Sequence, residues 1–111
     1  MERFSLATLA DDLLGRASDA GGGHSADTVL GGSDRVLRQT VIAMVSGSVL
    51  SEHENPGEAS VQVLRGQVRL VAGEESWTGG TGDLIVVPDA RHRLEALADS
   101  AVLLTVAKVV S

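Results

Sequence analysis

Two histidines stand in similar surroundings in this chain, about 40 residues apart. His53 lies in a short predicted strand that follows Gly47, and His92 follows an apolar run that closes at Pro88. A neutral imidazole can ligate a transition metal, move a proton, or hydrogen-bond an organic molecule. If the two runs are neighbouring strands, the two side chains can face one cavity. We therefore take His53 and His92 as the centre of a candidate site.

Two further polar residues follow His53 closely. Asn55 lies two residues on, and Glu58 lies beyond a Pro-Gly turn. An amide oxygen and a carboxylate could complete a metal site, which usually needs about three protein donors. They could equally contact an organic ligand. In the competing interpretation, Glu58 is the solvated tip of the turn and the histidines are hydrogen-bonded to Asn55, Ser51 or the backbone.

Strand alternation predicts the direction of these side chains. Successive residues of a strand point to opposite faces, and adjacent charged residues belong in water. In residues 49–55 this places Val49, His53 and Asn55 on the inner face, opposite two glutamates. In residues 92–97 it places His92 and Leu94 inside. The third histidine, in the glycine-rich segment before residue 27, is expected in solvent.

Composition excludes several function classes. The formal charge of −6 argues against nucleic acid as a partner, because phosphate binding needs clustered lysine and arginine. Without cysteine there are neither disulfides nor thiolate metal sites. The N-terminus lacks a signal-peptide pattern, and the apolar run at 101–110 is shorter than the roughly 20 residues that span a bilayer. We expect a cytoplasmic protein without a membrane partner, and the eight arginines against one lysine favour a bacterial source.

Short apolar runs separated by glycine and proline turns dominate the chain after residue 27. They predict strands at 28–30, 35–45, 49–55, 60–64, 67–72, 75–77, 83–87, 92–97 and 101–109. Before them, Ser5 can cap a helix with leucines at helical spacing, and Gly15 is its predicted end. The pattern indicates an all-β antiparallel sandwich or barrel. We expect one domain over 1–111, with a helix and loop at 1–27 and the barrel at 28–110.

The two histidine segments resemble the paired motifs of the cupin superfamily, G-x5-H-x-H-x3,4-E-x6-G and G-x5-P-x-G-x2-H-x3-N. Gly47, His53 and Gly66 match the first motif, Gly82 and Pro88 open the second, and the histidine at 92 stands near its histidine. The resemblance covers about residues 35–107. It implies an antiparallel double-stranded β-helix, the cupin jelly roll, with a short N-terminal helix.

The motifs are incomplete at the positions that bind metal in the family. Asn55 replaces the second histidine, and Ala59 stands at the glutamate position, with Glu58 one residue earlier. In the second motif Ala90 and Ala96 replace the glycine and the asparagine, and the histidine comes one residue early. A complete site would imply a divalent zinc, iron, manganese or nickel ion.

The resemblance therefore leaves several functions open. We favour a cupin that binds a small molecule in an aliphatic cavity, with His53, Asn55, Glu58 and His92 as ligand contacts. The alternative is a metal-dependent oxygenase or isomerase with His53 and His92 as ligands, and a purely structural module is the third. No cofactor is assigned, and whether the chain is an enzyme stays open. Because residues 35–45 and 101–110 are apolar on both faces, we expect a homodimer.

Overall fold

The computed structural model describes residues 2–53 and 57–108 of the 111-residue chain. It begins with one helix, α1 (Leu6–Asp19), whose predicted cap is confirmed: the Ser5 hydroxyl accepts a hydrogen bond from the Thr8 amide at 3.4 Å. The predicted end at Gly15 is wrong. Ala17 is fully buried one turn beyond Leu13, and this packing offsets the roughly 1 kcal/mol that glycine costs within a helix.

Nine strands follow the helix within the described residues. They are β1 (His24–Leu30), β2 (Leu37–Met44), β3 (Val49–His53), β4 (Gly57–Arg65), β5 (Gln67–Ala72), β6 (Glu75–Gly80), β7 (Leu84–Val86), β8 (His92–Ala96) and β9 (Ser100–Lys108). They form a five-stranded sheet in the order β1-β2-β9-β4-β7 and a four-stranded sheet in the order β3-β8-β5-β6. All pairings are antiparallel, as the predicted fold class requires.

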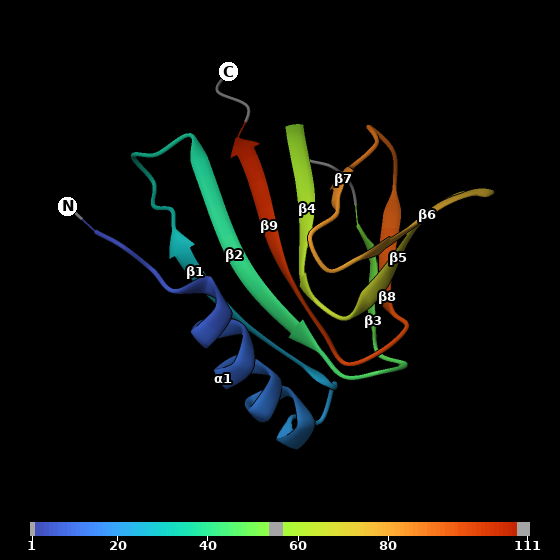
Figure 1. The fold of residues 1–111 in the computed structure, drawn as a ribbon. Helices are drawn as coiled ribbons and strands as arrows, with labels where there is room; N and C mark the ends of the chain where they lie inside the picture. Colours follow the sequence, from blue (N-terminus) through green and yellow to red (C-terminus); the bar gives the residue numbers. More distant parts are fainter. Residues whose placement is uncertain (1, 54–56, 109–111) are drawn as a thin grey trace.

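The two sheets face each other and enclose the main core (Figure 1). This core is aliphatic apart from one methionine, and its buried members come from both sheets: Met44, Val61, Val63, Val68, Leu70, Ile85, Val87, Leu94, Ala96 and Val102. Alternation along each strand sends these side chains inward. The histidine-bearing strands β3 and β8 are neighbours in the smaller sheet.

Helix α1 lies on the outer face of the five-stranded sheet (Figure 1). It buries a second core against β2 and β9, made of Ala10, Leu13, Ala17, Val41, Ala43, Ala101 and Leu103. The helix, rather than a second copy of the chain, therefore covers the outer apolar side chains of these strands. This corrects the reason that the sequence offered for a dimer.

The first strand starts earlier than expected. β1 begins at His24, so the boundary between the helix-and-loop segment and the barrel lies before residue 28. The backbone of His24 pairs with Met44, and the amide of Val45 donates to the Gly23 carbonyl at 2.9 Å. The His24 side chain is exposed, as predicted.

No helix within the described residues is long and apolar enough to cross a bilayer, and α1 has 14 residues.

Candidate functional site

His92 is the buried polar residue at the start of β8. Its side chain is 5% exposed and alternates with Leu94 and Ala96, which are also buried. The predicted inner face of this strand is therefore confirmed. The one-residue difference from the family spacing is taken up before the strand, where the amide of Ala90 donates to the Pro88 carbonyl at 2.8 Å.

A hydrogen bond fixes the tautomer of His92. Its Nδ1 lies 2.9 Å from the carbonyl oxygen of Ala90. A carbonyl only accepts, so in the neutral ring Nδ1 carries the proton and Nε2 carries the lone pair. Nε2 is thus the atom that can accept a hydrogen bond or ligate a metal.

An interior cavity of about 60 Å³ adjoins His92 between the two sheets. The other lining residues among those that the structure describes are aliphatic: Ile42, Leu50, Val61, Leu70, Leu94, Val102 and Leu104. This volume exceeds the roughly 10–15 Å³ that a water molecule needs. It is far below the roughly 300–1,000 Å³ of pockets that hold drug-sized ligands.

His53 lies opposite His92 in the register of β3 and β8. Leu50 pairs with Leu94 and His53 pairs with His92, so three steps along β3 match two along β8. Because of this irregularity, simple alternation does not hold along the whole of β3, and residues on its two sides change faces. Leu50 lies in the cavity lining and Val49 is 45% exposed, so the predicted inner position of Val49 is wrong.

Of the other two predicted site residues, the structure describes one. Asn55 lies outside the described residues. Glu58 is exposed on β4 and alternates with Ala59 and Val61, which pack toward the interior. It therefore stands on the outer face of its strand, which agrees with its interpretation as a solvated residue.

The described donors do not fit a metal site of the usual composition. Among the side chains that the structure describes, those of residues 2–52 and 57–108, there is no group of three or more histidine, cysteine, aspartate or glutamate that could hold an ion. Since a stable site usually needs about three donors, a metal here would require a donor from outside that part of the chain.

A ladder of opposite charges covers the other face of the smaller sheet, and the sequence analysis missed it. Arg69 on β5 and Arg93 on β8 each bind the Glu95 carboxylate at 2.9 Å. Arg91 lies 3.0 Å from Glu52, next to the bulged end of β3. Hydrogen bonds first from Arg93 and then from Arg69 lower the pKa of Glu95. The alternation of charged with buried residues at 91–96 is the sequence signal for this ladder.

The comparisons with known proteins agree on the architecture. A scan against family models and a search of curated proteins gave no match. Among solved structures, a cupin superfamily protein from Desulfitobacterium hafniense superposes with a TM-score of 0.71, at 18% identity, over 84% of this chain and 87% of that one. The chain has the fold of a small cupin domain.

Other structures similar to this cupin domain differ in what is known of them. A conserved protein of unknown function from Streptococcus pyogenes matches with 27% identity and a TM-score of 0.72, over 83% of this chain and 80% of that chain. A salicylate 1,2-dioxygenase from Pseudaminobacter salicylatoxidans matches with 20% identity and a TM-score of 0.75. That match covers 88% of this chain but 32% of the dioxygenase, so it supports the fold alone.

Proposed function

We propose that this cupin domain binds a small molecule inside its barrel, with His92 as the main polar contact and His53 beside it. The observation that carries the proposal is the buried imidazole of His92 in a cavity whose other described lining residues are aliphatic. A few polar groups in an apolar cavity are typical of small-molecule sites. The hydrogen bond from Nδ1 to the Ala90 carbonyl orients the ring beside this cavity.

The size of the cavity limits the ligand. A volume of about 60 Å³ favours a molecule of few non-hydrogen atoms that carries one hydrogen-bond donor. Its apolar part would contact Leu50, Leu70 and Leu104, which come from three different strands.

The test is a titration of the untagged, full-length protein with small alcohols and carboxylic acids, from ethanol to butyric acid. Two-bond proton–nitrogen spectra follow the imidazoles directly. We expect saturable binding of at least one compound to shift the His92 signals, and His92→Leu to abolish that binding. His24→Leu, at an exposed histidine, is the matched control. The absence of any binder, or binding that persists in His92→Leu, would contradict the proposal.

A metal-dependent enzyme of the oxygenase or isomerase class is the second candidate. The backbone pairing of His53 with His92, the two predicted histidine ligands, favours it. Elemental analysis of protein purified without chelator tests it. Zinc, iron, manganese or nickel near one ion per chain, lost in both His53→Ala and His92→Ala, would support this candidate. No ion after reloading would contradict it.

We also propose that the chain forms a homodimer, now through a different surface from the one that the helix covers. Leu84 and Val86 on the edge strand β7 are 62% and 75% exposed. Their strand partners Gln62 and Ser60 are uncharged. A patch without charge suits self-association of a chain whose net charge is −6, because like charges do not meet there.

A further inference from the structure

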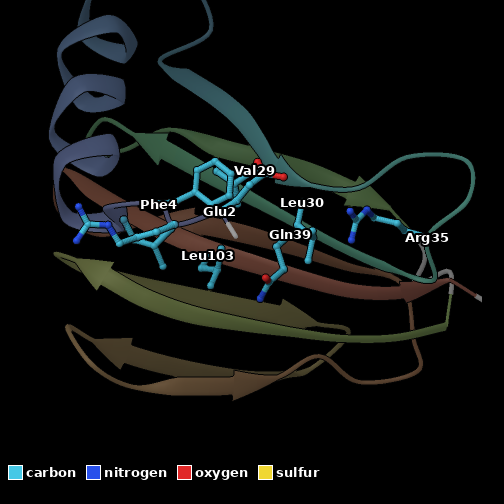
Figure 2. A pocket seen from close by; sticks show the side chains of 9 residues that line it. Glu2, Phe4, Val29, Leu30, Arg35, Gln39 and Leu103 are labelled. Atoms are coloured by element: carbon cyan, nitrogen blue, oxygen red, sulfur yellow. The ribbon is translucent and has the colours of Figure 1, made fainter.

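A second candidate ligand site on this molecule lies outside the barrel. A groove of about 410 Å³ separates the N-terminal segment from the outer face of the five-stranded sheet (Figure 2). Its volume falls within the range of about 300–1,000 Å³ typical of small-molecule sites. Its lining shares no residue with the interior cavity.

The floor and roof of this groove are apolar. Leu103 of β9, 7% exposed, lies in the floor next to Val29 and Leu30 of β1. Phe4 stands over them in Figure 2, held there by the segment that enters α1. Phe4 is 48% exposed, so a molecule in the groove would remove apolar surface of this ring from water.

The net charge of the groove lining is opposite in sign to the net charge of the whole chain. Arg3 and Arg35 contribute two positive charges and Glu2 one negative charge, which gives +1 in a chain of net charge −6. In the part of the chain that the structure describes, the ion pairs found leave out Arg3 and Arg35. A guanidinium binds a carboxylate through two parallel hydrogen bonds, so such a groove selects an anion.

The positions of these groups suggest an orientation for the ligand. In Figure 2, Arg35 lies at the opposite end of the groove from Phe4, with Leu30 and Gln39 between them. The Gln39 side chain is held by the neighbouring strand β9, since its Nε2 donates to the Thr105 hydroxyl at 3.1 Å. We propose that the groove binds a small amphipathic carboxylate. The apolar body lies between Phe4 and the sheet, and the carboxylate lies on Arg35.

Octanoate is the probe, and 1-octanol is its uncharged counterpart of equal chain length. Amide shifts in proton–nitrogen spectra of the full chain report where each binds. We expect octanoate to shift residues 2–6, 29–39 and 103, and to bind more tightly than 1-octanol. Phe4→Ala should weaken both compounds, because both use the apolar end of the groove.

Charge variants make the test specific. Arg35→Gln should weaken the binding of octanoate by about fivefold, which is the effect of losing a partly exposed ion pair. It should leave the affinity for 1-octanol unchanged. Glu2→Gln should increase the affinity for octanoate by about twofold, because it removes a negative charge that repels the carboxylate. The matched control is Arg38→Gln, which removes an exposed arginine of β2 outside the groove lining and should change neither affinity.

Four results would overturn this proposal. Equal affinity for octanoate and 1-octanol, or no effect of Arg35→Gln, would remove the anion selectivity. Shifts centred on the interior cavity, lost in His92→Leu, would place the probe at the other site. Groove signals that depend on protein concentration without a probe would mean that a second copy of the chain fills the groove.

Discussion

At the scale of single residues, Gly66 shows why a motif position tolerates only glycine. It forms the turn between β4 and β5 with a φ of 81°, a left-handed conformation. A Cβ there would collide with the Asp99 carbonyl oxygen and lie 2.9 Å from the Ser100 Cα. The fully buried Ser100 hydroxyl accepts from the Gln67 amide at 3.0 Å and donates to the Ala98 carbonyl at 2.7 Å, so this neighbour has little room to move.

Gly66→Ala should therefore lower the free energy of unfolding by more than about 2 kcal/mol, through left-handed strain of about 1–2 kcal/mol together with the collision. Urea denaturation followed by circular dichroism measures this. Gly73→Ala is the matched control, because Gly73 also has a positive φ of 61° but nothing within 4 Å of an added Cβ. Gly73→Ala should lower the free energy of unfolding by the strain contribution alone. Equal losses in the two variants would show that the collision is relieved at no cost.

At the scale of elements, the charge ladder ties three strands of the smaller sheet together. Glu95 binds Arg93 on its own strand and Arg69 on β5, while Glu52 on β3 faces Arg91. Exposed pairs contribute about 0.2–1 kcal/mol each. The ladder therefore stabilises the order β3-β8-β5 modestly, beneath the larger contribution of the aliphatic core.

The lowered pKa of Glu95 gives a pH dependence of defined sign. Because the carboxylate is favoured in the folded state, its stabilisation is complete above the unfolded pKa of about 4.3 and is lost as pH falls through the lower folded pKa. Glu95→Gln should make the stability less dependent on pH in this acidic range. Denaturation midpoints from pH 7 to about pH 3 measure it. Glu75→Gln, at an exposed position on β6, is the control, and an identical pH profile of Glu95→Gln and the parent would contradict the prediction.

Local sequence patterns predict the elements better than their ends. Residues 67–72 are a strand with the predicted bounds, because Gly66 and Gly73 both adopt positive φ at its ends. The helix passes through Gly15 because tertiary packing of Ala17 outweighs a local cost. The register shift in β3 could not be predicted, since it is set by pairing with β8 and strict alternation along β3 gives the wrong face to Val49.

At the scale of the whole molecule, the resemblance of two short motifs predicts the architecture but leaves the site incomplete. His92 follows from alternation because its strand is regular. The groove near Phe4 does not, because it needs the N-terminal segment placed over β1 and β9, which are far apart in sequence. Glu58 is close to His53 in sequence, but its strand β4 belongs to the other sheet.

The proposed dimer makes a prediction at this scale. Light scattering after size exclusion should give about twice the chain mass of 11.4 kDa for the parent protein. The pair of substitutions Leu84→Lys and Val86→Lys should give the monomer mass, because two charges would enter an apolar contact. Val36→Lys, at a residue 54% exposed in another part of the surface, should remain dimeric. A monomeric parent protein, or a dimer unaffected by the pair, would contradict this interface.

The position of β9 has a consequence for how the molecule is made. β9 is the last of the described strands in sequence order, yet it lies at the centre of the larger sheet, between β2 and β4. Ala107 of β9, for example, pairs with Leu37 of β2 on one side and with Glu58 of β4 on the other. During translation, β2 and β4 therefore emerge from the ribosome with the edges that will receive β9 still open. The larger sheet closes only when residues 100–108 have been synthesised, and until then the nascent chain presents two strand edges on which aggregation can start.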